Sequence, residues 1–211
     1  QLAEGAVVDL QGNNNFLRIF FLITGSVDFV SEGSTYSYEE PALYVNRPEY
    51  GVKIVAKKQA SVLEIRWDIT DAEKEEMALR SEEFPLVGKY SEAMEYRDPF
   101  KSEKTISRAI VPHRILPRFA MGSVETYGTD LIGQHSHPLL DQFFFSFPEN
   151  DCILLIDSTQ YPMKGDTLLH IPLGSNHGVF TGEEHCAHYL WIDFIPGEEG
   201  LAYLDDVHKP V

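Results

Sequence analysis

Several features that mark particular protein classes are scarce in this sequence. It contains two cysteines, Cys152 and Cys186, without C-x-x-C spacing, so neither a disulfide framework nor a cysteine metal site is indicated. No apolar run approaches the roughly 20 residues that cross a bilayer, and residues 1–8 lack the basic start and apolar stretch of a secretory signal. We therefore expect a cytoplasmic protein in a reducing compartment, with no membrane partner.

Positive charge is also scarce. The 211 residues include 17 Lys and Arg against 33 Asp and Glu, which gives a formal net charge of −16. Nucleic acids and anionic membranes attract basic surfaces, so this balance argues against either as a partner. The partner that we expect is a small-molecule substrate. The 43% hydrophobic content is enough to bury a core, which excludes an intrinsically disordered chain.

Short runs of β-forming residues, separated by turn residues, cover most of the chain. In the first half these runs are 16–23, 27–30, 35–38, 43–45, 52–55 and 61–67. In the second half they are 107–111, 118–126, 142–147, 152–156, 167–171 and 187–194. Turn residues between such runs are typical of antiparallel barrels or sandwiches. We therefore predict an all-β chain with two β-rich units, residues 1–70 and 106–196.

The segment between the two units contains the clearest helix signal. Thr70 is followed three residues later by Glu73, the spacing of a capping box, which predicts a helix over residues 71–80. Residues 81–104 contain Pro85, Gly88 and Pro99 without clear periodicity, so we expect 71–105 to be a helical and irregular linker. Residues 197–211 form a polar tail to which no element is assigned.

Histidine is absent from the first half of the chain. All eight histidines lie in the second half, at positions 113, 135, 137, 170, 177, 185, 188 and 208. His135 and His137 are two residues apart, which places both side chains on the same side of an extended chain. After a turn at Pro138, Asp141 or Gln142 could supply an oxygen ligand. If an imidazole metal centre exists, only the second unit can hold it.

Two segments of the second half resemble the paired motifs of the cupin superfamily. The second motif is matched at Gly165, Pro172, Gly174 and His177, with Thr181 in place of its closing Asn. The first is matched at His135 and His137, while other residues stand at its Gly and Glu positions. The resemblance covers residues 106–194. It implies two cupin-type double-stranded β-helix (jelly-roll) barrels, of which the N-terminal one lacks metal ligands.

The resemblance also implies a metal site in the C-terminal barrel. Its predicted metal ligands are His135, His137, Gln142 and His177. The commoner spacing in the family places Gln142 at the position of the missing Glu, and a shorter spacing places Asp141 there; we favour Gln142. Imidazole and amide ligands suit one divalent transition metal ion, Fe, Mn, Ni, Co or Zn, without selecting among them.

Other residues are candidates for chemistry or substrate binding around that ion. As catalytic residues we consider His188 and Tyr189, and as substrate-binding residues Arg118, Tyr127 and His170. The structural alternative for each is an ordinary packed or surface position.

Three functions are compatible with this sequence. The first is a metal-dependent enzyme that acts as a Lewis acid on a small oxygenated metabolite, such as a sugar acid or keto acid, by isomerisation, elimination or cyclisation. The second is a metal-dependent dioxygenase, and the third is a non-catalytic bicupin that binds a small ligand. We favour the first, and we expect a homodimer.

Overall fold

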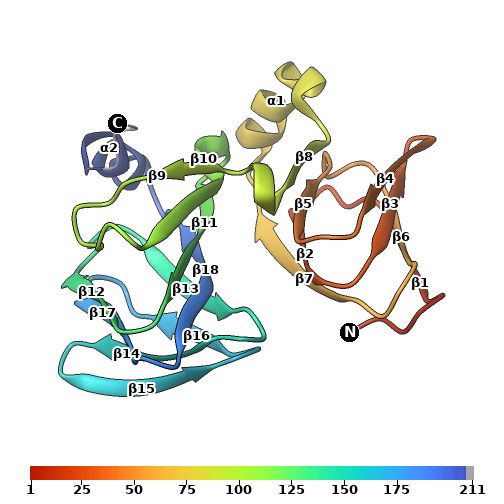
Figure 1. Ribbon diagram of the computed structural model, residues 1–211. Helices are drawn as coiled ribbons and strands as arrows, with labels where there is room; N and C mark the ends of the chain where they lie inside the picture. The colour runs from red at the N-terminus through yellow and green to blue at the C-terminus, as the bar shows by residue number, and fades with distance from the viewer. Residues whose placement is uncertain (208–211) are drawn as a thin grey trace. The chain divides into compact units, whose positions relative to one another are not determined.

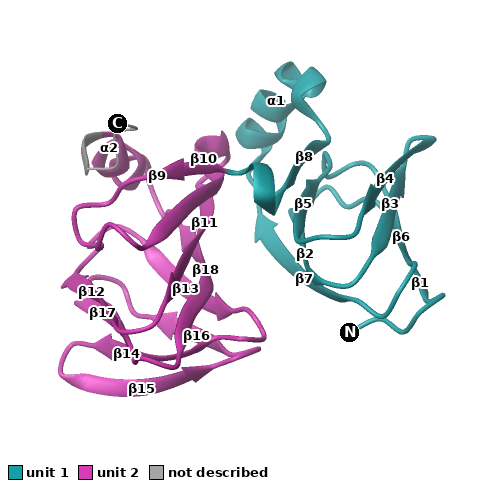
Figure 2. Ribbon diagram, in the orientation of Figure 1, with its two compact units in different colours: residues 1–93 teal, residues 94–211 magenta. Residues whose placement is uncertain are grey.

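The computed structural model describes residues 1–207, and the chain divides into two compact units, residues 1–93 and 94–211 (Figure 2). Each unit is built from two antiparallel β-sheets that face each other (Figure 1). This is the jelly-roll arrangement, so the all-β, two-barrel prediction is confirmed. His208 lies outside the described residues.

Unit 1 contains two four-stranded sheets. One has the order β1 (Val7–Leu10), β6 (Val52–Ala56), β3 (Val27–Ser31) and β4 (Ser34–Tyr38). The other has the order β7 (Ser61–Asp68), β2 (Phe16–Thr24), β5 (Ala42–Val45) and β8 (Leu86–Lys89). Each β-rich run predicted in the first half coincides with one of these strands.

Aromatic side chains fill the interior of unit 1. Phe20, Phe29 and Tyr44 are each at most 2% exposed, and the rings of Phe29 and Tyr44 stack with their centroids 4.7 Å apart. Burying a side chain of this size contributes about 1.5–3 kcal/mol. Because the interior is packed with these rings and no histidine precedes His113 in the sequence, unit 1 has no imidazole that could bind a metal.

Unit 2 contains one six-stranded and one four-stranded sheet. The larger has the order β16 (Leu168–Ile171), β13 (Asp141–Ser146), β18 (Cys186–Phe194), β11 (Phe119–Tyr127), β10 (Ile106–Leu116) and β9 (Met94–Tyr96). The smaller has the order β12 (Asp130–His135), β17 (His177–Thr181), β14 (Asp151–Ile156) and β15 (Thr159–Lys164). The cavity described below lies in this unit.

The helix after β7 begins as its sequence indicates. Helix α1 (Asp71–Leu79) is capped by Thr70, whose Oγ1 accepts a hydrogen bond from the Glu73 backbone N–H at 3.3 Å. The Glu73 carboxylate in turn accepts from the Thr70 backbone N–H at 2.7 Å. The predicted capping box is confirmed.

The segment expected to be a linker belongs to both units. After α1 and two short 3₁₀ turns, Ser81–Glu83 and Tyr90–Glu92, β8 pairs with β5 in unit 1 and β9 pairs with β10 in unit 2. Both strands are short, three or four residues, and lie at sheet edges. The free edge of a sheet made elsewhere in the chain determines such strands, so local residue pattern does not predict them.

A helix also forms in the polar tail, to which the sequence analysis assigned no element. Helix α2 (Glu198–Val207) buries Leu201 and Leu204 in a cluster with Leu140 and Ile195 of the same unit. Tertiary burial of one apolar face therefore stabilises a helix whose sequence is otherwise acidic and lacks a clear start signal.

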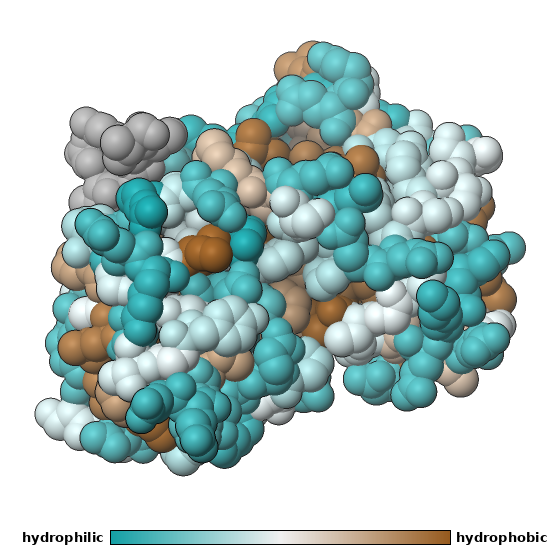
Figure 3. Space-filling view, in the orientation of Figure 1, coloured by the Kyte–Doolittle hydropathy of each residue, from teal (hydrophilic) through white to brown (hydrophobic). Residues whose placement is uncertain are grey.

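The surface that Figure 3 displays is mostly hydrophilic, with small scattered apolar areas. Neither of the α-helices within residues 1–207 is long and apolar enough to cross a membrane.

Candidate metal centre

Three histidines meet at one end of the small sheet of unit 2. His135 ends β12, His177 begins β17, and the two are partners in the register of these antiparallel strands. His137 follows two residues after His135. One ring nitrogen from each residue lies within 4.8 Å of the other two. Nitrogens bound to one first-row metal ion, each at about 2.1 Å, lie at most about 4.2 Å apart, so the cluster is close to the spacing that one ion requires.

Backbone carbonyls orient two of these imidazoles. His135 Nδ1 lies 2.8 Å from the Gly133 carbonyl oxygen, and His177 Nδ1 lies 3.2 Å from that of Ser175. A carbonyl can only accept, so Nδ1 carries the proton and Nε2 keeps its lone pair for a metal. Burial, together with the nearby His135, lowers the pKa of His177 to about 4. His177 is therefore neutral at pH 7, the form that binds metals.

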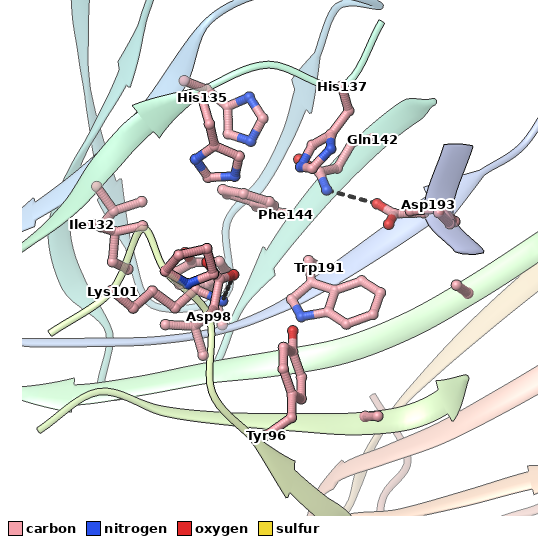
Figure 4. A pocket seen from close by; sticks show the side chains of 18 of the residues that line it. Tyr96, Asp98, Lys101, Ile132, His135, His137, Gln142, Phe144, Trp191 and Asp193 are labelled. Atoms are coloured by element: carbon pink, nitrogen blue, oxygen red, sulfur yellow. Dashed lines mark hydrogen bonds and ion pairs between the residues drawn. The ribbon is translucent and has the colours of Figure 1, made fainter. Parts of the chain in front are cut away.

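Gln142 supplies an unpaired oxygen beside the histidines. Its side chain on β13 is buried, and its Nε2 donates to Asp193 Oδ1 at 2.6 Å (Figure 4). Within the described part of the chain, Gln142 Oε1 is buried without a hydrogen-bond partner. A buried unpaired oxygen costs free energy, and a metal ion would satisfy it. The residues present thus fit a fourth ligand from Gln142.

Asp141 faces away from this cluster. Strand alternation directs neighbouring residues of β13 to opposite sides of the sheet. The Asp141 carboxylate lies 2.7 Å from His170 Nε2, and both side chains are exposed. Of the two alternatives at the position of the missing Glu, the structure brings Gln142 to the histidines.

A buried carboxyl group lies behind Gln142. Asp193 on β18 is 5% exposed. Burial raises the pKa of Asp193 to about 7, although the hydrogen bond from Gln142 and the charge of Lys101 oppose this shift. The carboxyl group holds the amide of Gln142 by its nitrogen and leaves the amide oxygen free.

The histidines and Gln142 line a cavity of about 370 Å³ (Figure 4). This volume is at the small end of the range for ligand sites. Its walls are mostly apolar and include Ala109, Ala120, Val124, Ile132, Phe144, Val179, Tyr189 and Trp191. Trp191 fits there because its partner on β11 is Gly122, where a Cβ atom would lie 2.2 Å from the indole.

The cavity also contains charged residues that the sequence analysis missed. Asp98 and Lys101 form an ion pair of 2.9 Å, and Tyr96 lies nearby on β9. Burial raises the pKa of the Tyr96 hydroxyl above its ordinary value of 10. These residues come from the segment predicted as a linker. In the sequence, the only sign of this ion pair is the three-residue spacing of Asp98 and Lys101, and such a spacing is common on protein surfaces.

The two candidate catalytic residues face opposite sides of β18. Tyr189 lines the cavity and is 2% exposed. His188, its neighbour on β18, points the other way, stacks on Phe147 at 4.0 Å and contacts Glu149. Strand alternation prevents these two neighbours from both facing the cavity.

The three predicted substrate-binding residues do not line the cavity. Arg118 lies in the β10–β11 turn with a φ of 50°. Tyr127 is 60% exposed at the end of β11. His170 pairs with Asp141 on the opposite side of β13 from Gln142. For each residue, its position in a turn, at a strand end or on the outer face directs the side chain away from the cavity.

No protein-family profile and no curated protein matches this sequence. Solved structures do match. An IolB-like protein (stm4420) from Salmonella typhimurium has a TM-score of 0.70 at 14% identity, over 93% of this chain and 82% of that chain. A Cupin 2 conserved barrel domain protein from Leptotrichia buccalis has a TM-score of 0.61 at 14% identity, over 92% and 80%. Oxalate decarboxylase from Bacillus subtilis, a protein with Mn(II) centres, has a TM-score of 0.64 at 13% identity. The match covers 97% of this chain and 74% of that chain. At such identities the likeness establishes the fold, and it extends over both units.

Proposed function

Because the chain has a two-barrel cupin fold, we propose that it is an enzyme that uses one divalent transition metal ion, held in unit 2, for redox-neutral chemistry on a small oxygenated metabolite. The reaction class is isomerisation, elimination or cyclisation, and the substrate is an acid of the keto-acid or sugar-acid type. The observation that carries this proposal is the convergence of three imidazole nitrogens and the free oxygen of Gln142 on one cavity.

His135, His137, His177 and Gln142 would hold the ion. Bound there, a divalent ion supplies a Lewis acid that polarises a carbonyl and acidifies the adjacent C–H or O–H. All four proposed ligands are neutral, so none of them reduces the charge of the ion, whereas a carboxylate would cancel one unit.

Residues around the four proposed ligands would prepare the site for that chemistry. The carbonyls of Gly133 and Ser175 fix the ring tautomers of His135 and His177. Asp193 orients Gln142 through its amide nitrogen. The apolar side chains of Phe144 and Trp191 exclude water from part of the cavity, which strengthens electrostatic interactions inside it.

Mn(II) centres in the B. subtilis oxalate decarboxylase, a structural neighbour of this chain, support a metal-dependent function. Two functions from other classes compete with the proposal. A dioxygenase would need a redox-active ion and O₂, and a binding module would hold a ligand without turnover.

The test is elemental analysis of protein purified without a histidine tag or added metal, alongside His135→Ala. We expect about one metal ion per chain in the wild type, lost in the variant, because removing one imidazole leaves too few ligands for tight binding. Leu131→Ala, on the exposed face of the same strand β12, is the matched control and should keep its metal.

The identity of the ion separates the competing functions. Zinc, nickel or manganese with turnover that persists without O₂ supports Lewis-acid chemistry. Iron with substrate-dependent O₂ consumption would replace it with the dioxygenase. Wild-type protein that takes up no metal, even after reloading, would overturn the proposal.

A further inference from the structure

A buried ion pair lies in the same cavity as the histidines. Lys101 Nζ is 2.9 Å from Asp98 Oδ2, and the two side chains are only 8% and 5% exposed. Figure 4 shows the Lys101 side chain running into the cavity toward Asp98. Apart from the three clustered histidines, two other basic residues line this cavity within the described chain: Arg97 is exposed and donates to the Glu103 carbonyl, and His113 pairs with Asp205. Lys101 is therefore the basic residue whose charge is buried there.

The turn that carries Lys101 is held against β12, the strand that ends in His135. The Phe100 carbonyl accepts a hydrogen bond from the Gly133 N–H at 2.8 Å, and the Phe100 ring stacks on His135 with centroids 4.6 Å apart. Ser102 and Thr105 donate to the Asp130 carboxylate at 3.0 and 2.8 Å. These contacts on both sides of Lys101 hold the turn against β12, and the bonds of Nζ to Asp98 and Ser107 then place the ammonium within the cavity.

The ammonium has one donor to spare. A lysine ammonium has three N–H donors. One bonds Asp98, and a second bonds Ser107 Oγ at 3.0 Å. Among the described residues no acceptor occupies the third, and the Tyr96 ring lies 5.5 Å away. Burial lowers the pKa of the Lys101 amine, and Asp98 opposes this shift. A buried charge is costly unless it is paired. A ligand that provides an acceptor for the third N–H would complete the hydrogen bonding of the ammonium.

The rest of the cavity limits the kind of acceptor. Asp98 and Asp193 both lie on its wall, so a dianion such as phosphate would meet two carboxyl groups and only one available ammonium donor. A carboxylate carries a single charge and accepts such a donor well. Val124, Ile132 and Val179 provide an apolar surface for the remainder of the ligand.

We propose that Lys101 binds the carboxylate of the substrate, and that the substrate is a small oxo or hydroxy carboxylic acid with an apolar body. This inference rests on the proposed function, because the oxo or hydroxyl oxygen is directed to the histidine cluster. Asp98 is a positioning residue that keeps the ammonium in place. The ion pair has no net charge, so it offers the carboxylate a directed hydrogen bond, and the preference for an acid over a neutral analogue should be on the order of tenfold.

The test compares an acid with its neutral analogue. Isothermal titration calorimetry measures the affinity of Zn(II)-loaded protein for 4-methyl-2-oxopentanoate and for its methyl ester. The double variant Lys101→Met with Asp98→Asn removes the ammonium without leaving a buried unpaired carboxylate. Lys104→Met is the matched control, since Lys104 lies in the same turn but is exposed and donates to the Thr129 carbonyl. Zinc content and thermal unfolding are measured for every protein.

We expect wild type and Lys104→Met to bind the acid about tenfold more tightly than the ester. In the double variant we expect this ratio to fall to about one, with ester affinity and zinc content unchanged, and Lys101→Arg to retain part of it. An unchanged ratio in a folded, zinc-loaded double variant would show that the pair only stabilises the turn, and would overturn the proposal. Acid that fails to bind zinc-loaded wild type would overturn the substrate class. Wild type without zinc would overturn the proposed function as well, and the zinc content identifies that case.

Discussion

The amide of Gln142 offers a hydrogen-bond donor on one side and a free acceptor on the other. Its amide nitrogen donates to the buried Asp193, and its amide oxygen remains free at the histidine cluster. A glutamate at this position has no N–H to donate. The amide at this position is therefore explained by the carboxyl group that accepts its N–H, and its free oxygen suits the proposed metal ion.

The hydrogen bond between Gln142 and Asp193 should affect the free energy of unfolding. Gln142→Glu should lower the free energy of unfolding of the metal-free protein by about 1–3 kcal/mol, because two buried carboxyl groups then face each other. Adding Asp193→Asn should recover most of that loss, since the amide and carboxylate have exchanged places. Urea unfolding measures both changes.

Metal content of the same two variants is the second readout. It should stay near that of the wild type, because a glutamate oxygen is also a good ligand. If the double variant were no more stable than Gln142→Glu, the complementarity of Gln142 and Asp193 would be refuted.

At the scale of elements, Asp130 at the start of β12 joins this strand to the turn that carries Lys101. Its Oδ2 accepts hydrogen bonds from Ser102, Thr105 and Thr126 at 3.0, 2.8 and 2.6 Å. Burial favours the neutral acid, but these hydrogen bonds outweigh it and lower the pKa of Asp130 below its ordinary 3.8. The ionised form therefore stabilises the folded state at neutral pH.

The contribution of Asp130 to the stability of the folded protein should depend on pH. Because folding lowers the pKa of Asp130, its stabilisation is present above pH 3.8 and is lost as the pH falls through the lower pKa of the folded protein. Asp130→Asn should reduce the free energy of unfolding by about 2 kcal/mol at pH 7, and the difference from wild type should shrink below about pH 4. Urea unfolding at several pH values checks this. Asp157→Asn is the control variant for this measurement. The Asp157 carboxylate accepts a hydrogen bond from the Asn176 N–H, but it lies in an exposed turn. A difference that does not change with pH would contradict the role of the ionised carboxylate.

At the scale of the whole molecule, the two units share an architecture and differ in what fills it. Stacked aromatic rings occupy unit 1, whereas unit 2 has a cavity lined by three histidines. The fold therefore repeats without repeating the site, as is common for scaffolds that carry many functions.

We accordingly expect one metal ion per chain rather than two. Zn(II) at about 100 times its dissociation constant should stabilise the protein by about 2.7 kcal/mol, which corresponds to roughly 5–10 °C in Tm for a chain of this size. His177→Ala should show no such shift, whereas His185→Ala, which removes an exposed histidine of the same unit, should behave as wild type. Differential scanning calorimetry with and without Zn(II) measures the shifts. Equal stabilisation of His177→Ala would place the metal elsewhere.

The long strands, helix α1 and the placement of His135 and His137 on one side of the chain could be predicted because their signals are local. β-rich runs between turn residues, the spacing of Thr70 and Glu73, and two histidines on one side of an extended chain all act within a few residues. The absence of histidine from the first half of the chain likewise assigned any imidazole site to unit 2.

Only the tertiary structure decided what surrounds the ligands. β9 and the turn with Asp98 and Lys101 are held by strands that are distant in sequence, and α2 forms because Leu201 and Leu204 find apolar partners on other elements. Whether His188 or Tyr189 faces the cavity depends on strand register, and a shift by one residue would exchange them. From the sequence, local β and histidine patterns together with the resemblance to the cupin motifs predicted the two barrels and the candidate metal ligands, whereas the cavity's charges and walls depend on contacts between segments far apart in the chain.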